Sequence, residues 1–347
     1  MRKIAYLTGT RAEFGLMENI LSALDKDSNW QLQLLVTGMH LMDEFGHTVS
    51  EVDRKFKVRA VIEAVFTKDD RLSMAQFVAK CLTGVTQKLI ELKPDVVMVL
   101  GDRGEQLAMA TAAAYLDMPV IHLHGGEMTT TVDDKARNAI SHLSDWHLPA
   151  TQKAAQRLIQ MGINKNHVQV VGAPGLDEIT KFNSSNQKDS IVVLQHPDEN
   201  EDDAAGQIRH TLEAALSFNL PVVVIYPNAD AGGRAQIAVI NEYKNRVKIY
   251  PSIGRSEFLQ LLSRAKVLIG NSSAALIEAP TLKLPAVNIG PRQLGRERGN
   301  NVIDCGYEQK QIKSAIAKTL RLKLNRITNP YGDGKTTQRV IKFLKTL

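Results

Sequence analysis

The sequence predicts an α/β protein built from two doubly wound domains, each a parallel sheet with helices on both faces. The chain has 347 residues, whereas single domains usually hold about 100–200. Short apolar runs alternate with longer helical patterns through both halves of the chain. A polar run, KFNSSNQKDS at 181–190, separates the halves and is typical of an exposed linker. We therefore expect one domain over residues 1–180 and a second over 181–330.

The expected strands are apolar on both faces, which is typical of a buried parallel sheet. In the first half they cover 3–8, 31–36, 58–66, 96–100, 120–123, 147–149 and 168–171, with helices over 14–24, 74–92, 105–116 and 153–161. In the second half they cover 191–194, 222–226, 247–250, 267–269 and 286–289, and the tail 335–347 is expected to be helical. Ligands of such folds bind at the carboxyl ends of the strands, so the loops there hold the candidate residues.

The amino-acid composition excludes several classes of protein. With 44% hydrophobic and 23% charged residues, the chain is neither disordered nor membrane-spanning, and its N-terminus lacks the features of a signal peptide. Two distant cysteines exclude a disulfide framework and favour a reducing, cytoplasmic location. The net charge of +6 is mild and forms no dense basic stripe, so we expect a small-molecule partner and neither nucleic acid nor membrane.

The loop after the first strand reads GTRAE over residues 9–13. A glycine turn that opens a helix exposes backbone N–H groups, and Arg11 adds a positive charge, so the loop suits a phosphate. An ordinary turn with a surface arginine explains the same residues equally well. The pattern is neither the dinucleotide fingerprint nor a P-loop, so no nucleotide cofactor is indicated.

Acidic residues gather after two neighbouring strands. Asp102 follows the fourth strand in GDRGE, Glu127 closes HLHGGE after the fifth, and Asp133 and Asp134 stand before a helix that carries Arg137. Crowded carboxylates raise one another's pKa and so form acid/base pairs. The alternative is that Asp102 and the paired acids cap helices.

Two histidines on one strand face, His122 and His124, have a spacing that metal ligands use. They raise the alternative of a metal-dependent amidohydrolase. Such enzymes carry the pair on the first strand of a barrel, whereas this pair follows four strands, so a structural role is favoured. No metal site is predicted.

A second group of candidates lies in the other half of the chain. Ser272 and Ser273 open a helix in GNSSAALIEAP, and Glu278 follows about a turn and two-thirds later. Serine hydroxyls and helix N–H groups suit a diphosphate, and Glu278 suits the hydroxyls of a ribose. A plain serine cap with a surface glutamate is the alternative. The loop PRQLGRERG over residues 291–299 supplies Arg292, Arg296 and Arg298, either for anion binding or as a solvated rim.

Together these motifs resemble the UDP-N-acetylglucosamine 2-epimerase family, most of all its hydrolysing branch in sialic and legionaminic acid biosynthesis. GTRAEFG, VTGMH, GDRGE, HLHGGE with TTTVDD and Arg137, QHPDEN, GNSSAALIEAP and NIGPRQLGRERG occur in the family's order, over roughly residues 2–304. The resemblance implies a GT-B fold: two Rossmann-like domains facing a cleft, with a C-terminal helical segment, 331–347, that returns to the first domain.

The resemblance also implies roles for individual residues. Asp102 and Asp133 match catalytic acids, with Asp134 and Glu127 beside them. Where many relatives have glutamate this chain has His124, so the role of that acid falls to Glu127 or to His124 itself. The substrate-binding positions that the resemblance implies are Arg11, His196, Phe258, Ser272, Ser273, Glu278, Arg292 and Arg296.

The implied reaction converts UDP-N-acetylglucosamine to N-acetylmannosamine and UDP through a 2-acetamidoglucal, without cofactor. Ala12 and Arg103 favour the hydrolysing branch. A UDP-2,4-diacetamido-2,4,6-trideoxyhexose is the alternative substrate, mildly favoured by the small Gly104. A GT-B glycosyltransferase is the alternative of another class, and a nucleotide-sugar binding module is a further one. Relatives associate, so a homo-oligomer, dimer or tetramer, is expected.

Overall fold

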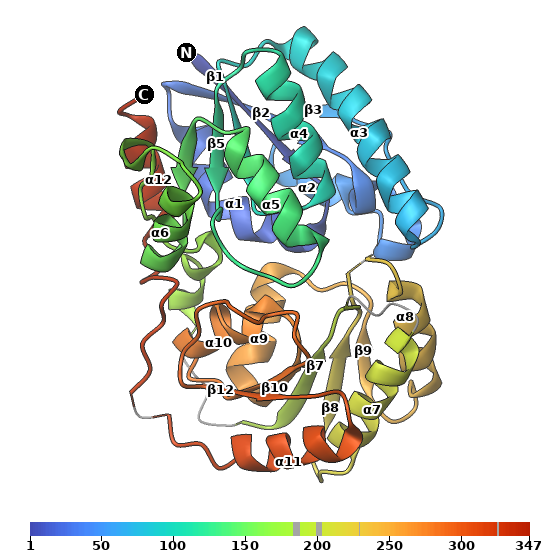
Figure 1. Ribbon diagram of the computed structural model, residues 1–347. Coiled ribbons are helices and arrows are strands. Elements are labelled where there is room, and N and C mark those ends of the chain that lie inside the picture. The colour runs from blue at the N-terminus through green and yellow to red at the C-terminus, as the bar shows by residue number, and fades with distance from the viewer. Residues whose placement is uncertain (183–187, 199–202, 229, 325) are drawn as a thin grey trace. The chain divides into compact units, whose positions relative to one another are not determined.

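The computed structural model describes residues 1–182, 188–198, 203–228, 230–324 and 326–347 (Figure 1). The chain forms two compact units. One contains Met1–Glu127, Val132–Asp177 and Tyr331–Leu347, and the other contains Met128–Thr131 and Glu178–Pro330. Residues 183–187 of the expected linker, and Glu199 and Asn200 of the QHPDEN motif, lie outside the described residues.

The first unit is a six-stranded parallel sheet in the order β3-β2-β1-β4-β5-β6. Its strands are β1 (Arg2–Thr8), β2 (Trp30–Val36), β3 (Val58–Val61), β4 (Val96–Leu100), β5 (Val120–Leu123) and β6 (Trp146–Leu148). The order reverses between β1 and β4, so the loops after these two strands lie at the point where doubly wound sheets bind ligands.

Seven α-helices cover this sheet: α1 (Arg11–Lys26), α2 (Val49–Lys55), α3 (Arg71–Leu92), α4 (Gly104–Tyr115), α5 (Val132–His142), α6 (Gln152–Gln160) and α12 (Thr336–Leu344). The first helix begins at Arg11 because the Thr10 side chain accepts the Glu13 N–H and so caps it. Its apolar face packs into one core with the strands and with Val340 and Phe343 of α12. The end of the chain is therefore part of the first unit.

The second unit repeats the architecture, with the strand order β12-β11-β10-β7-β8-β9, again parallel. Its strands are β7 (Ser190–Leu194), β8 (Val222–Ile225), β9 (Lys248–Tyr250), β10 (Ala265–Gly270), β11 (Ala286–Ile289) and β12 (Val302–Cys305). Its α-helices are α7 (Ala204–Leu216), α8 (Gly233–Glu242), α9 (Arg255–Arg264), α10 (Glu278–Thr281) and α11 (Gln309–Thr319). Two doubly wound parallel sheets confirm the predicted fold class.

Three strand predictions were inaccurate. Residues 168–171 form only an isolated bridge to His147, although the N–H groups of Gln169 and Val171 donate to the neighbouring chain. The third strand ends at Val61 and not at residue 66. The edge strand β12 escaped prediction because its residues are at best half-buried and Asp304 interrupts the apolar run. Within the described residues, no helix has the length and apolar character to cross a membrane.

Candidate active site

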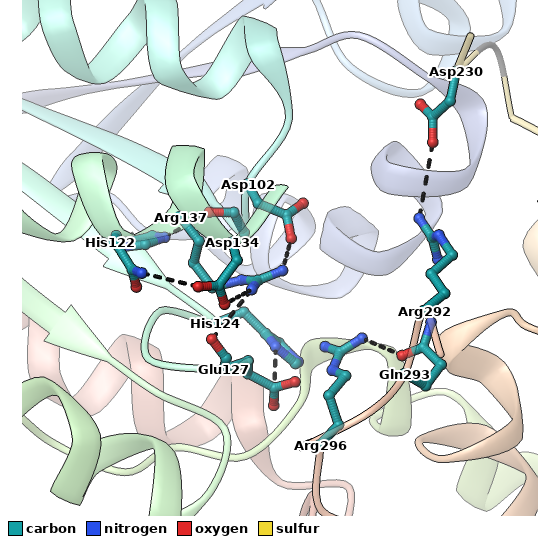
Figure 2. Close-up of polar contacts among 12 residues, drawn as sticks. Asp102, His122, His124, Glu127, Asp134, Arg137, Asp230, Arg292, Gln293 and Arg296 are labelled. Carbon is teal, nitrogen blue, oxygen red and sulfur yellow. Dashed lines mark hydrogen bonds and ion pairs between the residues drawn. The ribbon is translucent and has the colours of Figure 1, made fainter. Parts of the chain in front are cut away.

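Asp102 lies at the carboxyl end of β4, directly after Gly101, whose φ of +70° favours glycine. Its carboxylate forms a close ion pair with the guanidinium of Arg137, which α5 contributes (Figure 2). The alternative that Asp102 caps the next helix is wrong, because the N-cap of α4 is Arg103 and this helix start has no side-chain cap. Asp102 is instead turned towards the neighbouring strand end.

Arg137 organises the acidic cluster of the first unit. Only 2% of its side chain is exposed, and it contacts Asp102, Asp134 at 3.5 Å and the backbone carbonyl of Glu127 at 3.2 Å. Arg157 of α6 donates to the same carbonyl at 2.8 Å and to Asp134 at 3.2 Å. Two arginines thus fix the backbone of Glu127 and the carboxylate of Asp134. The sequence reasoning missed Arg157, which no motif contains.

Asp133 and Asp134 lie inside the first turn of α5, which begins at Val132, and not before the helix as expected. Acidic residues are favourable there because the helix N-terminus carries a partial positive charge. Asp134 is held by the two arginines, whereas Asp133 is half-buried beside it. The two neighbouring acids are therefore in different environments.

Glu127 and His124 lie together, so both candidates for the replaced acid are in the cluster (Figure 2). His124 Nδ1 is 3.7 Å from Glu127 Oε1, and the ring of Tyr331 stacks on the His124 ring at 6.2 Å between centroids. His124 has a φ of +65°, a left-handed conformation that non-glycine residues rarely adopt. Such strain costs about 1–3 kcal/mol and is concentrated at functional sites.

The two glycines before Glu127 allow close packing within the protein. A Cβ at Gly126 would lie 2.3 Å from the carbonyl oxygen of Ala154, and one at Gly125 would lie 2.8 Å from His122 Nδ1. The motif thus brings Glu127 close to α6 and to the buried His122.

His122 is a structural residue of the first unit. Its Nε2 donates to the carbonyl of Gly101 at 2.7 Å, and its Nδ1 is 3.1 Å from the Ser141 hydroxyl. Complete burial lowers the pKa of His122 to about 3, so the ring is neutral. Because both nitrogens are engaged, His122 and His124 do not form a ligand pair, and the described part of the chain has no group of three or more side chains placed to hold a metal ion.

The turn after β1 is occupied by carboxylates. Glu13 accepts the Thr8 hydroxyl at 2.7 Å and the Gly9 N–H at 3.2 Å, and a Cβ at Gly9 would collide with Glu105. Burial, followed by the nearby charge of Glu105, raises the pKa of Glu13 well above its usual range. Arg11 forms an ion pair with Glu51 at 2.9 Å. A phosphate at this turn would compete with Glu13 for the Gly9 N–H and with Glu51 for Arg11.

In the second unit, His196 follows β7 and is joined to Asn271 by two hydrogen bonds. The His196 N–H donates to Asn271 Oδ1 at 2.7 Å, and Asn271 Nδ2 donates to the His196 carbonyl at 2.9 Å. His196 Nδ1 accepts the N–H of Asn228 at 3.0 Å, which places the proton of the neutral ring on Nε2. The Nε2–H of His196 is therefore a hydrogen-bond donor.

The arginine loop is attached to the same asparagine. Gln293 donates to the Asn271 carbonyl at 2.8 Å and accepts from Arg296 at 3.1 Å. Arg292 lies 3.8 Å from Asp230. Arg298 has a different role, because it binds Asp304 and the Gln293 carbonyl and so holds the loop itself. His196, Arg292 and Arg296 thus belong to one network around Asn271.

The segment after Asn271 differs from the predicted helix. Ser272 caps a single 3₁₀ turn, Ser273–Ala275, and a separate short helix, α10, begins at Glu278. Pro280 has no N–H to donate to the preceding turn, so one continuous α-helix cannot run through it. The expectation that Glu278 lies about a turn and two-thirds into one helix that Ser272 and Ser273 open was therefore wrong.

Glu278 is buried, so the alternative of a surface glutamate is also wrong. Its Oε1 is 2.8 Å from the guanidinium of Arg255, which lies 5.8 Å from the ring of Phe258 on the same helix, α9. Glu278 and Phe258, predicted separately, thus lie on either side of Arg255. The sequence reasoning did not identify Arg255.

The chain is similar to known proteins over nearly its whole length. The family model for UDP-N-acetylglucosamine 2-epimerase matches residues 22–345. A Legionella pneumophila protein named UDP-N,N'-diacetylbacillosamine 2-epimerase (hydrolyzing) is 40% identical, over 100% of this chain and 96% of its own length. A Neisseria meningitidis UDP-N-acetylglucosamine 2-epimerase is 32% identical, over 100% of this chain and 95% of its own length.

The fold also has solved counterparts. The crystal structure of Methanocaldococcus jannaschii UDP-GlcNAc 2-epimerase, in complex with UDP-GlcNAc and UDP, has a TM-score of 0.86 at 22% identity and covers 99% of this chain and 100% of that one. The family match and the full-length relatives confirm the resemblance drawn from the motifs: this chain belongs to the UDP-N-acetylglucosamine 2-epimerase family.

Proposed function

We propose that this chain is a hydrolysing 2-epimerase of a UDP-activated 2-acetamido sugar. The observation that carries the proposal is the cluster of Asp102, Glu127, His124 and Asp134 around the buried Arg137, at the carboxyl ends of β4 and β5. Acid/base groups held at a sheet edge suit a reaction that removes one proton and returns another.

The proposed reaction has two stages. A base takes the proton from C2 of the sugar while the C1–O bond breaks, so UDP leaves with the electron pair and a 2-acetamidoglucal remains. Water then adds its hydroxyl to C1, and an acid returns a proton to C2 on the opposite face. Asp102, Glu127, His124 and Asp133 are the candidates for these transfers. Asp134 acts as a positioning residue, because Arg137 and Arg157 hold it.

The second unit supplies the nucleotide contacts in this proposal. The Nε2 of His196 and the guanidinium groups of Arg292 and Arg296 bind the diphosphate, with Ser272 and Ser273 at the adjoining turn. These charged and polar donors stabilise the leaving group as negative charge develops on it. Arg11 of the first unit remains the candidate for a further phosphate contact.

The nucleoside is assigned to the Glu278 cluster of the second unit. Phe258 supports the uracil ring, and Glu278 accepts the ribose hydroxyls. A carboxylate has about four acceptor positions, so the contact of Oε1 with Arg255 leaves capacity for two hydroxyls.

The small size of Gly104 does not favour a sugar with a bulky C4 substituent. A Cβ at Gly104 would lie 2.7 Å from Val78 Cγ2, so the small residue is required for packing of α4 on α3. The choice of sugar therefore depends on the relatives. The 40% identical relative favours UDP-N,N'-diacetylbacillosamine as the first candidate substrate, and the 32% identical one supports UDP-N-acetylglucosamine as the second.

A direct test measures free UDP from each nucleotide sugar without any acceptor. Release of UDP together with the free 2-epimer supports the proposal, and the faster substrate identifies the sugar. Accumulation of a UDP-linked epimer would contradict the hydrolytic step. Release that requires an added acceptor would favour a glycosyltransferase.

A further inference from the structure

The segment 331–347 places an aromatic side chain against the acidic cluster of the first unit. Tyr331 is completely buried, its ring stacks on His124 with 17° between the planes, and its hydroxyl is 3.5 Å from Glu127 Oε2. Tyr331 lies beyond the motifs that carried the resemblance.

The backbone at Tyr331 is fixed within the first unit. The Tyr331 carbonyl accepts the Ala173 N–H at 2.8 Å, and a Cβ at Gly172 would lie 3.2 Å from the same carbonyl oxygen. The Asp177 carboxylate accepts the N–H of Thr336 at 2.8 Å at the start of α12. These contacts hold the aromatic ring in place independently of any nucleotide site in the second unit.

Tyr331 contacts His124 and Glu127, and the conformation of His124 must be held by neighbouring residues. His124 has left-handed backbone geometry, which persists only where its surroundings hold it. The Tyr331 ring lies nearly parallel to the imidazole, with 6.2 Å between the centroids, and the phenol approaches the second oxygen of Glu127. We propose that Tyr331 is the positioning residue of the His124–Glu127 pair. This inference rests on the proposed function, because that pair is assigned there to proton transfer.

The arrangement predicts different effects for the hydroxyl and for the ring of Tyr331. The hydroxyl makes one long contact, 3.5 Å from Glu127 Oε2, so its removal should change turnover little. Loss of the aromatic ring should misplace His124, whose ring lies beside it.

The test compares Tyr331→Phe and Tyr331→Leu, with Tyr6→Phe and Tyr6→Leu as controls, because Tyr6 is equally buried but lies in the hydrophobic core of the same unit. Tyr331→Phe keeps the aromatic ring and should retain most of the wild-type kcat. Tyr331→Leu should lower kcat about tenfold or more and leave KM nearly unchanged, because misplaced catalytic groups slow the reaction while the nucleotide contacts remain. Neither Tyr6 variant should lower kcat in this way, even if its thermal stability falls as far.

A second readout does not need turnover. Proton–carbon NMR of histidine-labelled enzyme, with the His124 resonance assigned from His124→Gln, should show that resonance displaced in Tyr331→Leu and unmoved in Tyr6→Leu. An unchanged resonance, or a wild-type kcat in Tyr331→Leu, would overturn the inference. If the wild type releases UDP from neither sugar, the proposed function fails, while the NMR comparison still decides whether Tyr331 acts on His124.

Discussion

Acidification should weaken the first unit because three of its histidines, His40, His122 and His147, are buried and neutral. Burial lowers the pKa of His122 from 6.5 to about 3, and the pKa values of His40 and His147 to about 4 each. The unfolded chain binds protons below pH 6.5, whereas the folded chain resists them. Each ring therefore contributes stability that is present above pH 6.5 and is lost as the pH falls towards the folded-state pKa.

The size of the effect follows from these values. Below pH 6.5 one such histidine costs about 1.4 kcal/mol of unfolding free energy per pH unit, so His122 alone accounts for about 2 kcal/mol between pH 7.5 and 5. Glu13 opposes this trend, because its raised pKa makes protonation easier in the folded state. The contribution of His122 is therefore isolated by comparing the wild type with His122→Gln, which has no titrating ring but can still donate to Gly101.

The assay is urea unfolding at pH 7.5 and at pH 5. Tryptophan fluorescence reports on the first unit, because both tryptophans of the chain, Trp30 and Trp146, lie in it. The pH-dependent loss of stability should be about 2 kcal/mol smaller in His122→Gln than in the wild type. His47→Gln is the control, since that ring is exposed. Equal losses in the wild type and His122→Gln would refute the account of a neutral, buried ring that supports the Gly101–Asp102 turn.

Three further predictions concern the proposed chemistry. Asp102→Asn and Asp133→Asn should each keep UDP binding but lower turnover about 10²-fold or more, as removal of a positioned acid or base does; near wild-type turnover in both would contradict their assignment. Glu278→Gln should weaken UDP binding by about 1–3 kcal/mol, or about 5- to 150-fold, in calorimetry, and an unchanged affinity would remove Glu278 from the site. Turnover should survive exhaustive chelation, because both ring nitrogens of His122 are engaged in hydrogen bonds; loss of activity that zinc restores would revive a metal-dependent mechanism.

The fold was predictable because buried parallel strands are continuous apolar runs, as in β4 and β5. The failures occurred where that signal is weak. The edge strand β12 is only half-buried, and the strand expected at residues 168–171 is a bridge. The break before α10 was in principle readable from Pro280, whose missing N–H ends a helical ladder.

The candidate site was predictable only for residues at strand ends. Asp102 and Glu127 lie two and four residues after the ends of β4 and β5, so the order of the strands was enough to predict that they lie close together. Arg157, Arg255 and Tyr331 come from segments distant in the sequence, and only the folded chain brings each one to its carboxylate. The space around a glycine was likewise unreadable, since Gly104 looked like room for a substrate and proved to be packed against Val78.

The most direct test of the central claim is the reaction in heavy water, followed by proton NMR. With UDP-N,N'-diacetylbacillosamine or UDP-N-acetylglucosamine, the account predicts UDP and a free 2-epimeric sugar with deuterium at C2. The deuterium is expected because the acid that returns the second proton exchanges with solvent. A free epimer without deuterium at C2, or an epimer still joined to UDP, would contradict elimination followed by hydration.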